Sequence, residues 1–261
     1  MRQTCAKLRS LPWRSTRKGG SPVRLRFIHA MTGSSEHFLE REREILQGFA
    51  APDTEIDIKK ISSGAASIES KFDIYIGAVE TLQLVKQAEE QGFDGVVITC
   101  FGNADLEPAR ELVKIPVMGS GLAAMLLAAS LGHKFSVVAT LPAARRRHEL
   151  EAFKAGVLQK LASVRDIGTR VLAIDGDLDR TRRAMIETGR RCIEEDGAEV
   201  LVPGCFGFIG LASQMQEELG VPVIDPAGAA VRHIETLVKL GLSQSKRSYP
   251  TPPPKPRAFG F

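Results

Sequence analysis

One short motif occurs twice in this chain, and that repeat constrains the fold more than any other feature. Cys-Phe-Gly follows an apolar run at 100–102 and again at 205–207, so the two copies lie 105 positions apart. The apolar runs that open the two halves, at Arg24 and Lys134, are 110 positions apart. Chance similarity would rarely place Cys-Phe-Gly at the same point of two units, so the repeat predicts two similar lobes.

Short apolar runs alternate with longer segments of helical periodicity along the chain. Ala78, Leu82 and Val85, for example, recur at helical spacing with charged residues between them. Strands that alternate with helices are typical of parallel sheets. The sequence therefore predicts an α/β fold of two pseudo-symmetric lobes, each a four-stranded, mainly parallel sheet flanked by helices, with the active site in the cleft between them. The expected strands are 24–29, 55–61, 95–99, 115–118, 134–139, 170–174, 199–202 and 221–224.

The two ends of the chain differ in composition from its body. Residues 1–22 are rich in Arg and Ser and contain no acid, which fits a disordered basic extension, a mitochondrial presequence or a start codon assigned too early. Residues 251–261 form a proline-rich tail, which we expect to be extended or disordered. Between them we expect residues 23–118 together with 226–250 to form lobe 1, and residues 119–225 to form lobe 2.

The net charge of +4 comes from these basic ends, so the body of the chain is acidic and we expect no nucleic acid partner. No uncharged apolar run reaches the roughly 20 residues that span a membrane. Without a secretory signal we expect a cytoplasmic protein, unless the N-terminal segment is a cleaved mitochondrial presequence. No two of the four cysteines are spaced as CxxC and no two of the five histidines as HxxxH, so we expect no metal site.

The two repeated cysteines, Cys100 and Cys205, are the candidates for chemistry. Open α/β sheets bind ligands at the carboxyl ends of their strands, so both thiols are expected to face the cleft. A helix N-terminus close by would lower the pKa of each thiol. One thiolate could then remove a proton from a carbon acid while the other thiol returns one to the opposite face. The alternative is that both are buried core residues, the usual place of a lone cysteine, as we expect for Cys192.

The chain resembles the aspartate/glutamate/hydantoin racemase superfamily, in particular its hydantoin and allantoin racemases. The resemblance is carried by the two cysteine motifs, the run Ser67-Ile-Glu-Ser70 and the ending Gly241 to Pro250. The resemblance covers roughly residues 24–256. It implies two α/β lobes with the site between them, and Cys100 and Cys205 as the acid–base pair. It also implies no cofactor, neither pyridoxal phosphate nor metal, a small-molecule substrate and a homo-oligomer.

The loops that would contact the substrate depart from the family pattern. Where the hydantoin racemase branch usually has Asn-Pro-Asn-Thr after its first strand, this chain has His29-Ala-Met-Thr32. After the first cysteine it has Phe101-Gly-Asn-Ala-Asp105, and Leu122 replaces a glutamate that is frequent in the glycine-rich stretch. Two interpretations of His29 remain open, a substrate contact or the end of a strand in solvent. The conserved pair supports the reaction type, whereas the altered loops leave the substrate open.

The candidate binding residues lie in the loops after the expected strands. Their hydroxyl, amide and backbone N–H groups suit a carboxylate or an imide carbonyl, although serine and threonine often cap helices instead, and Asn103 could do either. The run Arg145 to Arg147 fits a solvated helix face, or less favourably an anion site. The candidates are Thr32, Ser34, Thr99, Phe101, Gly102, Asn103, Gly119, Thr140, Gly204, Phe206 and Gly207.

These patterns favour a cofactor-independent racemase that inverts the acidic C–H stereocentre of a hydantoin- or allantoin-like substrate with two cysteines. Three alternatives remain: an aspartate/glutamate-type racemase, a decarboxylase or isomerase of the same superfamily, and a non-enzymatic two-lobed protein that binds a small ligand.

Overall fold

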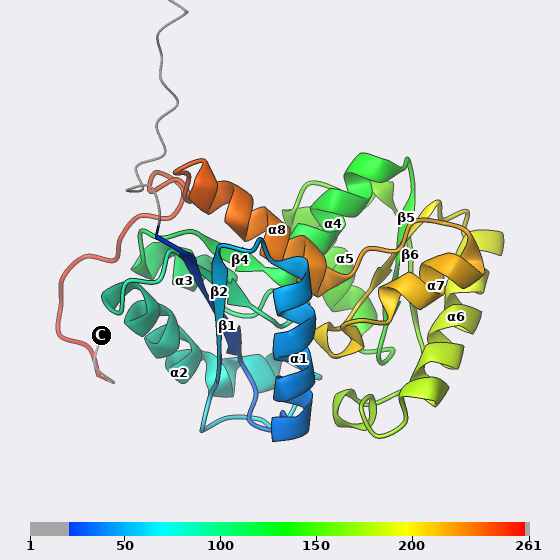
Figure 1. The fold of residues 1–261 in the computed structure, drawn as a ribbon, viewed down its shortest axis with the longest axis horizontal. Helices are drawn as coiled ribbons and strands as arrows, with labels where there is room; N and C mark the ends of the chain where they lie inside the picture. The colour runs from blue at the N-terminus through cyan, green and yellow to red at the C-terminus, as the bar shows by residue number, and fades with distance from the viewer. Residues whose placement is uncertain (1–20, 259–261) are drawn as a thin grey trace, which may run out of the picture.

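The computed structural model describes residues 21–258, which form two parallel sheets side by side with helices on their faces (Figure 1). The strands are β1 (Val23–His29), β2 (Thr54–Lys60), β3 (Gly95–Ile98), β4 (Val117–Gly119), β5 (Phe135–Ala139), β6 (Leu161–Asp166) and β7 (Val200–Pro203). The first sheet has the order β2-β1-β3-β4 and the second the order β6-β5-β7, and every paired strand is parallel. The α/β class is therefore confirmed, with sheets of four and three strands.

Four of the eight α-helices in the described part of the chain begin at a residue whose side chain accepts a hydrogen bond from an N–H group of the first turn. Ser35 accepts a hydrogen bond from the Phe38 N–H, and Ser70 and Asp73 form a reciprocal capping box. The helices are α1 (Glu36–Phe49), α2 (Lys71–Glu90), α3 (Leu106–Leu112), α4 (Ser120–Leu131), α5 (Ala144–Lys154), α6 (Leu178–Glu194), α7 (Ala212–Leu219) and α8 (Pro226–Lys239). Three 3-10 segments lie between them: η2 (Leu158–Lys160), η3 (Val171–Ala173) and η4 (Phe206–Phe208).

The second sheet repeats the topology of the first, with β5, β6 and β7 in the places of β1, β2 and β3. The prediction of a fourth strand at 221–224 is wrong, because only one bridge forms there, between Leu201 and Val223. The segment between Pro222 and α8 is too short to form a strand. Pro222 has no N–H to donate to a neighbouring strand, and Asp225 already caps α8.

A second prediction is also wrong. The apolar run 170–174 forms η3 rather than a strand, and the third strand of this sheet is β6. β6 pairs with β5 alone, and Val164 is its one fully buried residue, so β6 lacks the apolar run that the inner strands show. The run at 170–174 is apolar although it forms no strand, because Val171, Leu172 and Ile174 line a cavity.

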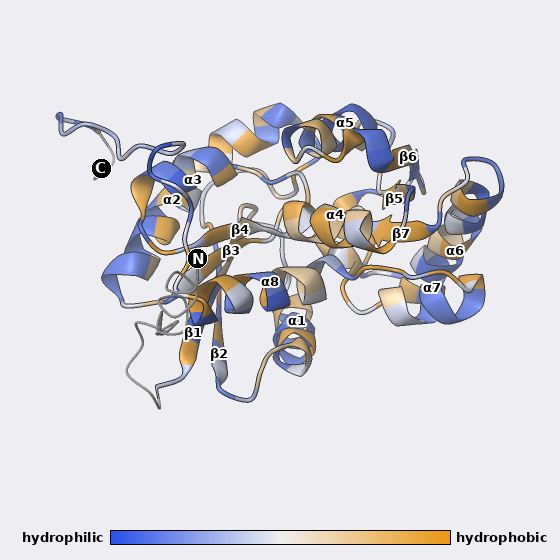
Figure 2. Cartoon of the chain, turned by 90° about the horizontal axis from the view of Figure 1, so that it is seen from above, coloured by the Kyte–Doolittle hydropathy of each residue, from blue (hydrophilic) through white to orange (hydrophobic). Residues whose placement is uncertain are grey.

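Helices α4 and α8 pack against each other and join the two sheets (Figure 1). Their small buried residues, such as Ala124 and Ala230, let the helices approach closely. Both belong to one apolar cluster that also includes Phe27 of β1 and Val137 of β5. Figure 2 shows the hydrophobic strands inside and the mixed faces of the helices outside. The two sheets therefore share one continuous core.

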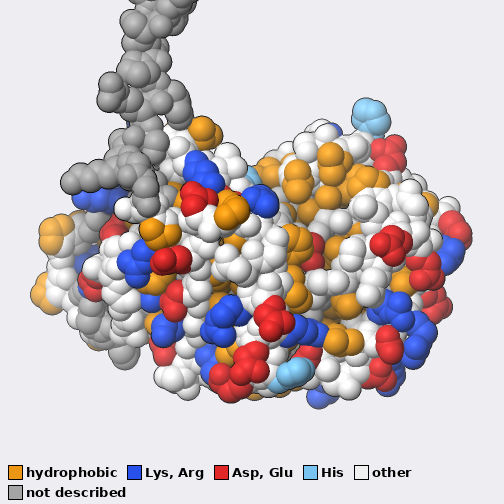
Figure 3. All heavy atoms as spheres, in the orientation of Figure 1, with side chains coloured by type: hydrophobic (Ala, Val, Ile, Leu, Met, Phe, Trp, Pro, Cys, Tyr) orange, Lys and Arg blue, Asp and Glu red, His pale blue; other side chains and the backbone are white. Residues whose placement is uncertain are grey.

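The ends and the surface carry little further information about function. Of the expected basic extension, residues 1–20 lie outside the described residues, and 251–258 form no helix or strand. No helix of the described residues is long and apolar enough to cross a membrane. On the face shown in Figure 3, Lys and Arg side chains are interspersed with Asp and Glu. The lobe boundaries expected from the sequence stay predictions.

Candidate active site

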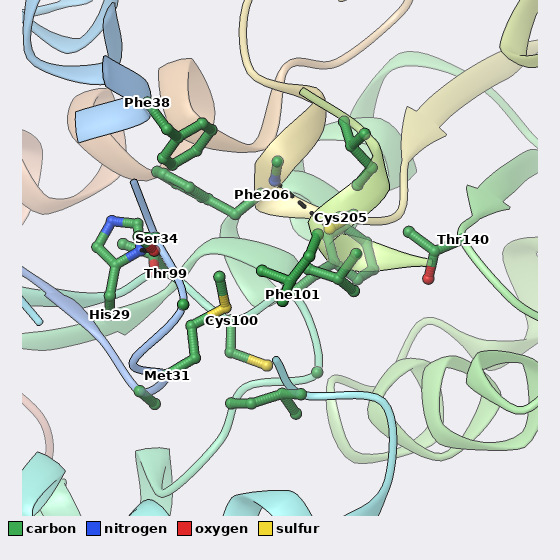
Figure 4. Close-up of a pocket in the computed structure, with 18 of the residues that line it drawn as sticks. His29, Met31, Ser34, Phe38, Thr99, Cys100, Phe101, Thr140, Cys205 and Phe206 are labelled. Carbon is green, nitrogen blue, oxygen red and sulfur yellow. Dashed lines mark hydrogen bonds between the residues drawn. The ribbon is translucent and has the colours of Figure 1, made fainter. Parts of the chain in front are cut away.

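A cavity of about 320 Å³ lies at the carboxyl ends of β1, β3, β5 and β7. His29 ends β1, Cys100 follows β3, Thr140 follows β5 and Cys205 follows β7. Both repeated cysteines line this one cavity, with Phe101 and Phe206 beside them (Figure 4). Within each sheet the strands are parallel, so the loops that follow them lie at the same edge of that sheet.

Eight of the eleven predicted binding residues line the cavity: Ser34, Thr99, Phe101, Gly102, Thr140, Gly204, Phe206 and Gly207. Thr32, Asn103 and Gly119 lie outside its lining. The Thr32 N–H donates to the Ala65 carbonyl over 3.0 Å. Asn103 Oδ1 accepts from the N–H of Leu122 in the first turn of α4 over 3.0 Å, so it acts as a helix cap. Gly119 packs directly against the Asn103 side chain.

Several lining residues were not predicted from the sequence. The apolar ones lie in runs that look the same whether they pack in the core or face a cavity; they are Ala30, Met31, Phe38, Ile68, Val171, Leu172 and Ile174. Arg147, His148 and Asp175 are polar additions. Arg147 did carry a signal, since it belongs to the arginine run on α5, whereas nothing in the spacing distinguishes His148 or Asp175.

Cys205 begins the turn η4, and its Sγ accepts a hydrogen bond from the Gly207 N–H over 3.4 Å (dashed line in Figure 4). Burial raises the pKa of this thiol to about 12, against the effect of that hydrogen bond. Negative charge on Cys100 raises it further. The two thiols are therefore coupled, so that ionisation of one opposes ionisation of the other.

Burial also raises the pKa of the Cys100 thiol. The Arg147 guanidinium opposes this rise, as do the N–H groups of Gly102 and Ala104. The sequence-based expectation of lowered thiol pKa values is therefore wrong in direction. The cavity removes water from both sulfurs, and α3 begins only at Leu106, so no helix N-terminus lies directly at Cys100.

His29, Ser34 and Glu42 form a buried hydrogen-bonded chain at the wall of the cavity. His29 Nε2 lies 3.0 Å from Oε1 and 2.8 Å from Oε2 of Glu42, and Nδ1 lies 3.2 Å from Ser34 Oγ. In the neutral tautomer that carries its proton on Nε2, the ring donates to Glu42 and Nδ1 accepts the Ser34 hydroxyl proton. The Ser34 oxygen is then left as an acceptor for a ligand N–H. Figure 4 shows Ser34 beside the His29 ring.

The remaining charged groups of the lining differ in how they are paired. Asp175 Oδ1 lies 2.9 Å from Arg41 Nη2, so its charge is compensated. Burial, aided by the nearby Arg147, lowers the pKa of His148 to about 3, which keeps its ring neutral at neutral pH. The Nε of Arg147 is buried and has no hydrogen-bond partner among the described residues.

Comparison with known proteins identifies the family of this chain. The family model of the Asp/Glu/hydantoin racemases matches residues 28–234. The chain belongs to this family. It is 36% identical to a hydantoin racemase of Paenarthrobacter aurescens over 234 residues, 88% of this chain and 99% of that protein. These relatives make it an isomerase of the racemase type, and the family predicted from the sequence is confirmed.

Solved structures agree with the sequence comparison. The allantoin racemase of Pseudomonas fluorescens is 37% identical, with a TM-score of 0.85 over 90% of this chain and 99% of that one. The allantoin racemase of Klebsiella pneumoniae is 36% identical with the same TM-score, over 90% of this chain and 96% of that one. An arylmalonate decarboxylase at 17% identity and a TM-score of 0.59, over 82% of this chain and 92% of that one, shares the fold alone.

Proposed function

We propose that this racemase inverts the acidic C–H stereocentre of a hydantoin- or allantoin-like substrate, with Cys100 and Cys205 as its two acid–base groups. The observation that carries the proposal is that two cysteines from matched loops of the two sheets line one cavity. The relatives include a hydantoin racemase and allantoin racemases that match nearly the whole chain.

The proposed reaction needs one thiolate and one thiol on opposite faces of the substrate carbon. The thiolate removes the C5 proton of the hydantoin ring, and the carbanion delocalises into the adjacent ring carbonyl. The thiol then delivers its proton to the other face, which inverts the centre. Coupling between the two thiols favours this state, because charge on Cys100 makes Cys205 hold its proton more tightly. Cys100 carries the stronger stabilisation of a negative charge, so we assign it as the base in the resting pair.

The charges of the cavity favour a ring substrate over a free amino acid. An amino acid carries an ammonium group that needs an anionic partner, and Asp175, the one acid of the described lining, is already paired with Arg41. Ser34, with its proton directed to His29, offers an acceptor that suits a ring N–H. A hydantoin C–H is also more acidic than that of an amino acid, so less of the barrier has to come from the enzyme.

The experiment is racemisation of single hydantoin and allantoin enantiomers by Cys100→Ser and Cys205→Ser, followed by polarimetry. We expect each substitution to lower racemisation by roughly 100-fold or more, in the range of a lost general acid or base. Cys192→Ser is the matched control, because Cys192 does not line the cavity. Full activity in Cys100→Ser would contradict the assignment, and release of carbon dioxide from a malonate would point to a decarboxylase instead.

A further inference from the structure

The three arginines at the start of α5 have different surroundings. Arg145 is exposed and pairs with Glu149 one turn along the same helix, at 3.1 Å. Arg146 is exposed as well. Arg147 is half-buried and lines the active-site cavity. Arg147 therefore faces the cavity, whereas Arg145 and Arg146 lie on the solvent-exposed face of α5.

Arg147 lies against the backbone of the first cysteine loop. A Cβ atom on Gly102 would come within 2.9 Å of both Cδ and Nε of Arg147, so the absence of a side chain at Gly102 makes room for this contact. The guanidinium is close enough to both thiols to lower the pKa of each, against the larger effect of burial. The positive charge thus sits at the reaction centre.

Among the described residues no acid forms an ion pair with Arg147, although its charge helps to lower the pKa of Asp73. Nε of Arg147 is buried without a partner among the described residues. The nearby Asp73 accepts hydrogen bonds from the N–H groups of Glu69 and Ser70 and from the Ser70 hydroxyl, and Asp175 pairs with Arg41. A half-buried cation without a partner is costly, and a ligand that supplies the missing anion recovers this cost.

A second cavity of about 300 Å³ touches the same side chain, since Arg147 and Gly102 line both. That cavity already holds both signs: Lys154 lies 3.1 Å from Glu107 and 3.7 Å from Glu151. In the active-site cavity Arg147 is the one Lys or Arg of the described lining. The second cavity also contains Asp105, whose Oδ2 has no partner among the described residues, whereas the one acid of the active-site lining is already paired with Arg41. An anion for Arg147 in the active-site cavity must therefore come from a ligand.

We propose that Arg147 binds a carboxylate on the side chain of the substrate, so that this racemase prefers hydantoins whose C5 substituent ends in a carboxylate. This inference rests on the proposed function and adds the substrate class. An arginine pairs with a carboxylate through two parallel hydrogen bonds, which orients as well as attracts the substrate. The ring then lies between the two thiols with its charged arm toward α5.

The test compares two hydantoins of nearly equal shape, one with a carboxyethyl and one with a carbamoylethyl group at C5. The readout is the ratio of their kcat/KM values, because any effect of Arg147 on the thiols is common to both and cancels. In the native protein we expect the carboxylate to be preferred by roughly 10- to 100-fold, the range of a hydrogen bond to a charged group. Arg147→Met should abolish the preference, Arg147→Lys should keep part of it, and Arg146→Met should leave it unchanged.

An unchanged ratio in Arg147→Met overturns the inference, as does a native preference for the amide. If the native protein racemises neither compound, the proposed function fails, and calorimetric binding of the carboxyethyl hydantoin still decides the role of Arg147. Affinity that falls at least tenfold in Arg147→Met but not in Arg146→Met supports a carboxylate site. Equal affinity in all three proteins contradicts it.

Discussion

The two Cys-Phe-Gly loops have the same sequence and follow equivalent strands, yet their surroundings differ in charge. A Cβ on Gly102 would meet Arg147, whereas a Cβ on Gly207 would meet the apolar Ile174, with Cδ1 at 3.1 Å. Cys100 receives two backbone N–H groups and Cys205 receives one. The charge of Arg147 lowers the pKa of both thiols, and it is the largest effect opposing burial at Cys100 but not at Cys205. The repeat therefore builds two equivalent positions, and the residues that do not repeat make the two thiols unequal.

The strands before these loops show the same kind of difference. His29, at the end of β1, takes part in the buried chain with Glu42 and Ser34, while the equivalent end of β5 is Ala139. Polar side chains nevertheless line the cavity from both sides, because Thr140, Arg147 and His148 follow β5 in the second sheet. In our account the first sheet supplies the base and the Ser34 acceptor, and the second sheet supplies the acid and the charge of Arg147.

The largest effect is expected from Glu42→Gln, because it breaks a fully buried pair. Gln replaces the buried carboxylate that accepts the His29 Nε2–H by a neutral amide, and losing a hydrogen bond to a charged group costs about 1.5–3 kcal/mol of unfolding free energy. Without the Glu42 carboxylate the His29 ring is no longer held with Nδ1 toward Ser34. The Ser34 oxygen should then be lost as an acceptor for the substrate. Denaturant unfolding measures the first effect and KM for a hydantoin the second. The exposed Glu40→Gln on the same helix is the control, and equal stability of the two variants would contradict the role of Glu42.

The inequality of the two thiols can be measured by alkylation with iodoacetamide. Burial raises the pKa of Cys205 to about 12, while Arg147 and two N–H groups offset the rise at Cys100. We expect Cys100 to react at least about tenfold faster, since the thiolate is the nucleophile. Mass spectrometry of peptides after short exposure gives the two rates. Faster modification of Cys205 would reverse the assignment of base and acid.

Arg147→Met should raise the pKa of Cys100 further, because it removes a positive charge that opposes the effect of burial. Activity that depends on the Cys100 thiolate rises with pH through its pKa, so the rising limb of kcat/KM should move to higher pH in the variant. A neutral hydantoin is used for the pH profile, so that no carboxylate contact is changed. An unmoved limb would show that Arg147 does not act on the thiol.

The smallest effect concerns a matched pair of backbone positions, Asp105 in the first loop and Gly210 in the second. Both have positive φ, 56° and 84°. Asp105 also carries an unpartnered buried Oδ2, and burial raises its pKa to about 6. A raised acid pKa means that stability falls as pH rises from about 4 through 6.

Asp105→Asn should therefore stabilise the protein by about 1 kcal/mol at pH 8, since partial solvent access reduces the gain, and by much less at pH 4. Asparagine also tolerates positive φ. Thermal unfolding at the two pH values checks this, with Asp53→Asn as an exposed control. A gain that is equal at both pH values would assign the effect to backbone conformation alone.

Much of this arrangement could be predicted from the sequence because it repeats. The recurrence of Cys-Phe-Gly placed both cysteines after inner strands, and strand direction then brought them to one cavity. The parts that could not be predicted depend on residues without a periodic signal. The apolar run from Val171 to Ile174 would look the same in a strand, in the core or at a cavity, and only the fold shows that it lines a cavity. Arg147 differs from Arg145 only by its angle around α5.

The pKa directions failed for a related reason. A pattern of residues indicates which charges and N–H groups come close to a thiol, but not how much water the fold removes from it. At Cys205 the desolvation outweighs the hydrogen bond from Gly207, and that balance is a property of the closed cavity. Sequence therefore predicted the position of each thiol better than its ionisation.

The most direct test of the two-base account follows one hydantoin enantiomer in deuterated water during early turnover of the native protein, with an enzyme-free sample for background exchange. A thiol carries a single proton, so the account predicts deuterium at C5 of the inverted product while the recovered substrate keeps its hydrogen. Deuterium that appears equally fast in recovered substrate and product would mean that a single group removes and returns the proton on both faces, and would contradict the pairing of Cys100 with Cys205.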